Sequence, residues 1–406
     1  MPGPGLELVG DEEIAEIVEV LRNRELSRYR FDDGADGTDV SKVLTFEREL
    51  AALTGVRHCL GTNSCTSALL AGLLAGRYEP GAEVIVPGYT FIASIASIGY
   101  AGLTPVLAEV DESLTLDPAD VARKVTDRTV GVMAVHMLGA PADLDALRTV
   151  CDEHGLDLFE DCAQAGGATY KGRHVGGFGT FGAFSLNVFK TFTAGDGGVL
   201  LTDDDELFER AFAIHDHGAA PYRAGVRDTG VLLGLNLRMH ELTGAVALAQ
   251  VRKLPGLLDR LRARQSALRA AIGEPAGVRE RRLPDPSGDC GTTLTYLFDR
   301  EEHAKRVAAE LGTITLSGSG RHNYVNMGPV RAQALPPTLR VRQPDLSRFA
   351  AGVLPRTDDL LSRAITLSVG VSDSYLGASF GIRPSSEPDE IAAAAEHFVD
   401  VVERLR

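Results

Sequence analysis

One lysine, Lys190, lies between a short apolar segment, residues 181–186, and a glycine-rich turn at residues 195–198. The apolar segment predicts a buried strand, and an ammonium group near its end is costly to bury unless it is paired or deprotonated. Desolvation lowers the pKa of a lysine, and a deprotonated lysine is a nucleophile toward carbonyl groups. Lys190 is therefore a candidate for holding a cofactor covalently. The alternative is a lysine whose amine reaches from the strand end to water.

Asp161 follows a second apolar segment, residues 156–160. In open α/β sheets, ligands bind outside the carboxyl ends of the strands, so Asp161 and Lys190 could face one crevice. A Schiff-base lysine with an aspartate for a pyridinium nitrogen is the arrangement that binds pyridoxal 5′-phosphate (PLP). Considered alone, Asp161 could equally cap a helix that follows the strand. The two residues together favour a PLP site.

A polar turn at residues 61–66 leads directly into the apolar residues 68–71. Free backbone N–H groups and the positive end of a helix dipole make such a turn a candidate anion site. A plain helix cap by Asn63 or Ser64 explains the same sequence. The turn becomes informative only in combination with Lys190 and Asp161.

Five segments in a fixed order make the chain resemble the DegT/StrS-type sugar aminotransferases, a PLP-dependent family of aminotransferase fold type I. They are GTNSCTSAL at 61–69, VIVPGYTF at 84–91, EDCAQ at 160–164, FS at 184–185 with Lys190, and GLNLRM at 234–239. The resemblance covers nearly the whole chain. It implies transfer of an amino group from glutamate or glutamine to a ketosugar, either nucleotide-linked or a cyclitol, in amino-sugar or antibiotic-type biosynthesis.

The resemblance also implies the cofactor contacts. Lys190 would bind PLP covalently, and Asp161 would pair with the ring nitrogen. The other contacts that it implies are Cys65, Thr66 and Ser185 at the phosphate, Phe91 stacked on the ring, Gln164 beside the ring hydroxyl, and Asn236 and Arg238 at the phosphate of the neighbouring subunit's cofactor. The last two roles require a homodimer with shared sites. Cys65 replaces a usual glycine, and it would be strained if that position needed a positive φ.

The order of segments predicts an α/β protein with two domains. Residues 1–255 would form the large PLP-binding domain, with an N-terminal helix and a mainly parallel sheet covered by helices. Residues 256–406 would form a smaller α+β domain. The predicted helices are 46–53, 64–74, 92–100, 118–125, 144–154 and 205–215, and the predicted strands are 83–86, 106–110, 130–135, 156–160, 181–186 and 199–202.

A long helical pattern at residues 239–268 contains the predicted domain boundary, and Pro255 is expected to kink or break this helix. Beyond it we expect strands at 292–298 and 313–316 and helices at 301–311 and 390–405. Residues 317–348 look loop-rich because they hold four prolines and three glycines. Residues 30–39 read as a surface loop that, by resemblance, lies near the substrate.

Composition excludes several other classes of protein. The formal net charge of −15 argues against nucleic acid and anionic membranes as partners, since both need a basic surface. No signal segment or membrane span is visible, which predicts a cytoplasmic protein. The five cysteines are widely spaced and lack a CxxC pair, so we expect reduced thiols, with no disulfide framework and no zinc or other metal site.

Three alternatives share the same fold. A related branch dehydrates sugars and carries histidine in place of the lysine, so Lys190 argues against it. A PLP-dependent cyclase, lyase or decarboxylase acting on an amino acid would use the same residues, and only its products would differ. A non-catalytic regulatory or binding protein would be expected to have a defect in the pair Lys190 and Asp161, and none is visible.

Overall fold

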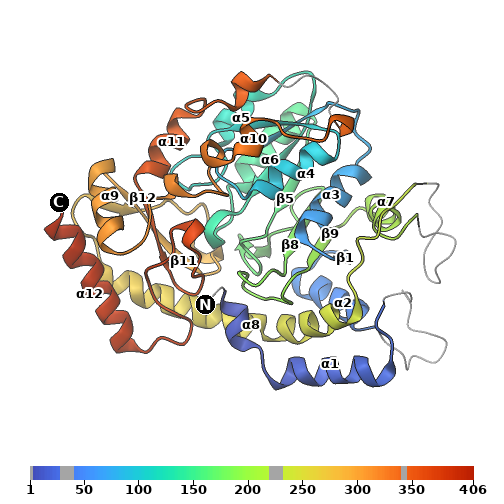
Figure 1. The fold of residues 1–406 in the computed structure, drawn as a ribbon, viewed down its shortest axis with the longest axis horizontal. Helices are drawn as coiled ribbons and strands as arrows, with labels where there is room; N and C mark the ends of the chain where they lie inside the picture. Colours follow the sequence, from blue (N-terminus) through green and yellow to red (C-terminus); the bar gives the residue numbers. More distant parts are fainter. Residues whose placement is uncertain (1–2, 28–40, 219–231, 340–344) are drawn as a thin grey trace.

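A seven-stranded sheet forms the centre of the computed structural model, which describes residues 3–27, 41–218, 232–339 and 345–406 (Figure 1). In spatial order the strands are β1 (His58–Thr62), β9 (Gly198–Thr202), β8 (Phe181–Ser185), β5 (Asp157–Asp161), β4 (Thr129–Val135), β2 (Glu83–Pro87) and β3 (Thr104–Ala108). Within this sheet, β9 runs antiparallel to both of its neighbours and the other pairs are parallel. The predicted mainly parallel sheet is confirmed.

Helices cover both faces of the sheet, because its strands are apolar on both sides. Val84 and Val86 of β2 join one core, whereas Ile85 between them joins the other, as expected for alternating side chains. The first core includes α3 (Cys65–Ala75), α4 (Ile92–Tyr100) and α7 (Asp205–His215). The second includes α2 (Lys42–Thr54), α5 (Pro118–Lys124), α6 (Leu144–His154) and the first half of α8 (Glu241–Ile272).

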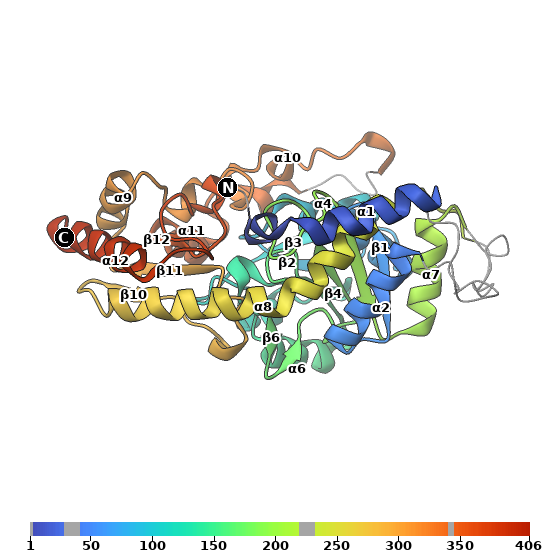
Figure 2. The same cartoon turned by 90° about the horizontal axis from the view of Figure 1, so that it is seen from below.

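Helix α8 runs along both halves of the molecule (Figure 2). It packs against α1 (Asp11–Asn23) and α2 near its start and against α12 (Pro388–Arg404) near its end. Of the two outcomes predicted at Pro255, the break is wrong, since the helix continues to Ile272, and the kink stays a prediction. Pro255 lies on the exposed side of α8, while Leu254 and Leu258 around it are buried in the core. This packing holds the helix together where the proline removes a backbone hydrogen bond.

The C-terminal part forms a third core around a small antiparallel sheet of β10 (Val278–Glu280), β11 (Thr293–Phe298) and β12 (Ala364–Ser368). Helices α9 (Glu301–Glu310) and α12 pack on it. The predicted strand at 313–316 is wrong. The Thr313 N–H bonds back to Ala308 at the end of α9, and Leu316 begins a short 3-10 helix. The sheet uses β12 instead, which the sequence patterns did not identify.

Shorter elements complete the described chain. They are the helices α10 (Gly328–Arg331) and α11 (Pro355–Ser362), the hairpin of β6 (Thr169–Tyr170) and β7 (Arg173–His174), and the 3-10 helices Pro4–Leu8, Met137–Gly139, Pro286–Gly288, Leu316–Gly318, Tyr324–Asn326, Pro337–Leu339, Leu346–Phe349 and Ser374–Leu376. No described helix is both long and apolar enough to cross a membrane. The loop predicted at residues 30–39 lies outside the described residues, and cytoplasmic localisation stays a prediction.

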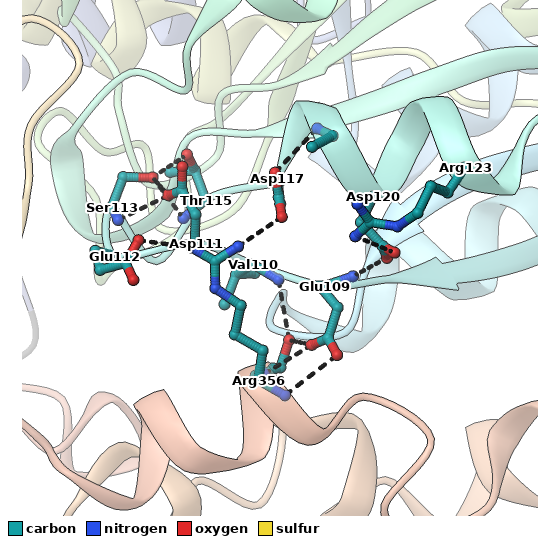
Figure 3. A network of polar contacts seen from close by, with 12 residues as sticks. Glu109, Val110, Asp111, Glu112, Ser113, Thr115, Asp117, Asp120, Arg123 and Arg356 are labelled. Carbon is teal, nitrogen blue, oxygen red and sulfur yellow. Dashed lines mark hydrogen bonds and ion pairs between the residues drawn. The ribbon is translucent and has the colours of Figure 1, made fainter.

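A polar network joins the start of α11 to the segment after β3 (Figure 3). The Glu109 carboxylate, which is 8% exposed, accepts the Thr357 N–H at 2.7 Å and the Thr357 hydroxyl at 2.5 Å. Arg356 donates to Asp117 and Glu112, both at 2.7 Å. A carboxylate is favoured at the N-terminus of a helix, so this network fixes α11 to the large sheet. The predicted domain division at residue 255 itself stays a prediction.

Candidate active site

A cavity of about 330 Å³ lies at the carboxyl ends of the parallel strands. Strand β5 brings Asp161 to it, β8 brings Ser185, and the loop after β8 brings Lys190. Cys65 and Thr66 at the start of α3 line it, as do Phe91 and Gln164. The structure therefore places together all predicted site residues except Asn236 and Arg238. Such a cavity at strand ends is the expected ligand site of an open α/β sheet.

Asp161 is buried and holds its carboxylate in a fixed position. The Ser94 hydroxyl donates to Oδ2 at 2.6 Å, and the Ala163 N–H donates to Oδ1 at 3.0 Å. Because the Ser94 proton is used on Asp161, the Thr90 hydroxyl, 2.7 Å from Ser94, donates to Ser94 in turn. Each carboxylate oxygen thus accepts one hydrogen bond from the chain. Asp161 can therefore accept a hydrogen bond from a cation in the cavity.

Lys190 lies in a partly buried loop beside this carboxylate. Burial lowers the pKa of its amine, and the nearby carboxyl groups of Asp161 and Asp373 partly offset that shift. A lowered pKa increases the neutral, nucleophilic fraction of the amine. The N-terminal segment supports the loop, since the Gly5 N–H donates to the Lys190 carbonyl at 3.3 Å. A side chain at Gly3 would collide with the Phe189 backbone at 2.4 Å.

The start of α3 forms the polar end of the cavity. Ser64 caps the helix by accepting the Ser67 N–H at 3.1 Å. Cys65 lies at the first helical position and does not have a positive φ, so the strain considered for a cysteine there is absent. Strand β9 approaches closely, because a Cβ on Gly198 would lie 2.3 Å from the Cys65 nitrogen. Gly198 pairs in register with Ser185, which brings the Ser185 hydroxyl to the same end of the cavity.

Phe91 and Gln164 line the cavity between its two ends. Phe91 is 37% exposed, and its ring centroid lies 5.3 Å from that of His322. Burial lowers the pKa of His322 to about 3, with smaller contributions from the charges of Lys190 and Arg321, so its ring is neutral. Gln164 accepts the Leu138 N–H at 2.9 Å, which orients its side-chain amide. The neutral ring of His322 thus packs against Phe91, whose aromatic ring lines the cavity.

Asn236 and Arg238 are outside the lining of this cavity. Asn236 is exposed, and Arg238 donates to the fully buried carboxylate of Asp216. The segment runs beside the start of α3, because the Asn63 N–H donates to the Leu237 carbonyl at 2.8 Å. Asp216 therefore holds the Arg238 guanidinium in place at the edge of the large sheet.

The sequence analysis missed the residues that the C-terminal part contributes to the cavity, among them Arg321, His322, Asp373 and Tyr375. The first two lie in the loop-rich region 317–348, and the others lie beyond β12. No periodic pattern marks polar residues in loops, so the sequence carried no signal for them. Backbone hydrogen bonds attach this loop to the Phe91 segment, from Ile92 N–H to Arg321 and from Thr90 N–H to His322.

Within the part of the chain that the structure describes, one group of potential metal ligands is found, formed by His136, Glu160 and Cys162. His136 Nδ1 accepts the Ala142 N–H at 3.0 Å, so the neutral ring carries its proton on Nε2 and donates it to Glu160. Three backbone N–H groups also donate to the Glu160 carboxylate. Burial raises the pKa of the Cys162 thiol. His136 and Glu160 thus use their polar atoms in hydrogen bonds within the chain. We therefore interpret the cluster as structural, tying the ends of β4 and β5 to the loops beside them.

A comparison with known protein families shows to which family the chain belongs. The DegT/DnrJ/EryC1/StrS aminotransferase family matches residues 32–371 of the chain. The chain belongs to this family. Membership of the DegT/DnrJ/EryC1/StrS family confirms the resemblance seen in the sequence segments, and it confirms the prediction of an aminotransferase.

Two curated relatives of this family member are L-glutamine:2-deoxy-scyllo-inosose aminotransferases. The one from Micromonospora echinospora is 34% identical over 349 residues, which cover 80% of this chain and 81% of the relative. The one from Streptoalloteichus tenebrarius is 39% identical over 259 residues, which cover 62% of this chain and 60% of the relative. The chain thus spans less than two thirds of the second relative's length.

A solved structure of DesI in the presence of its TDP-sugar product has a similar fold. The similarity covers 97% of this chain and 90% of DesI, with a TM-score of 0.72 and 28% sequence identity. This similarity and the mainly parallel sheet confirm the predicted fold class, which is the fold type of PLP-dependent aminotransferases.

Proposed function

We propose that this family member is a PLP-dependent aminotransferase that transfers an amino group from glutamine or glutamate to a ketosugar or ketocyclitol. The observation that carries this proposal is the cavity shared by Lys190 and the buried carboxylate of Asp161. The names of the curated relatives favour glutamine and a ketocyclitol, and DesI favours a nucleotide-linked sugar. Amino-sugar or antibiotic-type biosynthesis is the corresponding pathway class.

The donor set of the cavity fits PLP. The amides at the start of α3, with Thr66 and Ser185, suit a phosphate. Phe91 offers an aromatic face, and Asp161 offers a carboxylate to the ring nitrogen. Gln164 would lie beside the ring hydroxyl, and the Lys190 amine would bind the cofactor covalently. Bound PLP supplies a protonated ring into which the electron pair of a substrate carbon can delocalise.

The residues of the chain then have separate tasks. Asp161 would hold the proton of the ring nitrogen, because its carboxylate is fixed by Ser94 and Ala163. The amine of Lys190 would be the base that takes the proton from the donor carbon that bears nitrogen, and it would later return a proton to the acceptor carbon. Its lowered pKa suits this base role, since the amine must be neutral to accept the proton.

A product screen tests the proposed activity. Purified protein is incubated with a panel of ketosugars and ketocyclitols and with either glutamine or glutamate, and products are analysed by mass spectrometry. We expect one acceptor class to gain a single amine. Loss of carbon dioxide or cyclisation of an amino acid, without amine transfer, would instead identify the cyclase, lyase or decarboxylase alternative.

The active unit that we propose is a homodimer with two shared sites, each completed by Asn236 and Arg238 of the other subunit. The support is positional, because both residues lie beside the start of α3 and yet outside their own chain's cavity. A two-fold axis near this segment would serve both subunits equally. The guanidinium of Arg238 has the fixed fork of donors that suits a phosphate.

Subunit mixing tests this arrangement. Lys190→Ala protein and Asn236→Ala/Arg238→Ala protein are each expected to be inactive alone. After exchange, a mixed dimer has one site with both lesions and one intact site, so up to about half of the wild-type activity per mixed dimer should return. Mixing Lys190→Ala with Asp161→Asn protein is the control, because both lesions belong to the same chain's cavity. Demonstrated exchange without recovery would contradict shared sites.

A further inference from the structure

Arg321 extends into the cavity from the C-terminal part of the chain. Its backbone is fixed, because its carbonyl accepts the Ile92 N–H at 3.0 Å. Its guanidinium lies over the Tyr375 ring, 5.0 Å from the centroid, and forms no ion pair with any residue of the described ranges. The backbone of Arg321 is thus fixed by a hydrogen bond, and its guanidinium rests on the Tyr375 ring. The N–H donors of the guanidinium are available to a ligand in the cavity.

Among the described residues that line the cavity, Arg321 and Lys190 are the arginine and lysine side chains, and His322 is neutral. Both cations act on Asp373. Burial raises the pKa of its carboxyl group, and the charges of Lys190 and Arg321 lower it. Lys190, Arg321 and Asp373 thus line one cavity, and Asp373 accepts the N–H of Tyr375, the residue whose ring Arg321 covers, at 2.8 Å.

This position matches a requirement of the amino donor. Glutamine and glutamate carry the α-carboxylate on the same carbon as the reacting amine, so the carboxylate enters the cavity whenever that amine reaches the position of Lys190. An unpaired carboxylate is costly to bury, and a guanidinium presents two parallel N–H donors that match it. We propose that Arg321 binds the α-carboxylate of the amino donor, an assignment that rests on the proposed aminotransferase function.

The diphosphate of a nucleotide-linked acceptor is a second anion that could enter the cavity. We favour the carboxylate because Arg321 and Lys190 line one cavity, and the donor's carboxylate is only one carbon from the reacting amine. A diphosphate is attached to a sugar ring and can extend toward solvent. The two ligands belong to different half-reactions, so kinetics can separate them.

The test measures each half-reaction of cofactor-loaded protein separately, by the absorbance of the cofactor in single turnovers. One arm uses glutamine or glutamate, and the other uses the amino sugar or aminocyclitol product, which lacks an α-carboxylate. Arg321 is exposed, so the loss should be smaller than for a fully buried charge pair: in Arg321→Ala we expect kcat/KM for the amino acid to fall roughly 10-fold to 100-fold, mainly through KM. The amino-product arm should change by less than about twofold. Arg321→Lys should fall between these variants and wild type.

A binding titration gives a second measurement that needs no turnover. Calorimetry of cofactor-loaded protein with 2-oxoglutarate should show weaker binding for Arg321→Ala. The matched control is Arg331→Ala, an exposed arginine that lies on the same segment and outside the cavity lining, and it should bind as the wild type does.

The outcomes are distinct. Unchanged amino-acid kinetics in Arg321→Ala, equal losses in both arms, or a loss confined to a nucleotide-linked amino product would each overturn the assignment, the last in favour of a diphosphate. Wild-type protein that converts no amino acid would overturn the proposed function. In that case, the 2-oxoglutarate titration still decides whether Arg321 holds a carboxylate.

Discussion

Lys190→Ala protein is expected to lose amino transfer, with kcat/KM reduced by at least about 1000-fold, because one amine both binds the cofactor and moves the proton. The cavity keeps its other proposed PLP contacts, so the variant should still bind PLP without a covalent bond. In the wild type, borohydride reduction followed by peptide mapping should find the cofactor on Lys190. The burial that lowers the pKa of this amine also favours its attack on an aldehyde.

Lys171→Ala is the matched control for this experiment. Lys171 is exposed, pairs with Asp145 at the surface and lies outside the cavity, so its loss should leave turnover and the reduced adduct unchanged. A reduced adduct on Lys42, Lys124, Lys171, Lys253 or Lys305 would show that the assignment of Lys190 is wrong. Absence of any adduct would favour a protein like the histidine-carrying dehydrating branch or a non-catalytic protein.

Asp161→Asn is the second change with a large expected effect. A neutral amide matches the carboxylate in shape but cannot stabilise a protonated ring nitrogen, so we expect kcat to fall by about 1000-fold, equivalent to about 4 kcal/mol of transition-state stabilisation. The variant should fold, because the amide oxygen can still accept one of the hydrogen bonds from Ser94 and Ala163. Steady-state kinetics together with thermal unfolding would separate loss of chemistry from loss of fold.

Ser94→Ala is a useful comparison for Asp161→Asn. It removes the hydroxyl that donates to Oδ2 and leaves the charge of Asp161 intact, so its effect on kcat should be much smaller. Retention of more than about a tenth of wild-type kcat by folded Asp161→Asn, a loss of less than about 1.4 kcal/mol, would exclude the electronic role of Asp161.

The sequence was sufficient for the residues that lie at strand ends. Asp161 and Ser185 are the last residues of β5 and β8, and parallel strands bring their carboxyl ends to one edge of the sheet. Their meeting with Lys190 therefore follows from local patterns plus one rule of topology. The shared-site role of Asn236 and Arg238 depends on a second subunit, and it stays a prediction.

The features that the sequence did not predict depend on tertiary contacts. Arg321 and Tyr375 reach the cavity through loops of the C-terminal part, and no periodicity in the sequence places a loop. Pro255 remains inside α8 because buried neighbours on both sides outweigh its local cost. Residues 313–316 resemble a strand in composition, but Thr313 is bonded to the end of α9 and β12 takes the place beside β11.

The junction between β3 and α11 has a consequence for hybrid proteins assembled from relatives. Glu109 is buried, and its carboxylate accepts hydrogen bonds from the backbone N–H and the hydroxyl of Thr357, which lies 248 residues further along the chain. A hybrid that takes its C-terminal part from a relative inherits this carboxylate without its matched partners, unless the donor supplies a hydroxyl and an arginine at positions 357 and 356. An uncompensated buried carboxylate is strongly destabilising. When C-terminal parts are exchanged to alter acceptor specificity, the relative should therefore also supply its own residues at positions 109, 112 and 117, so that they match its α11.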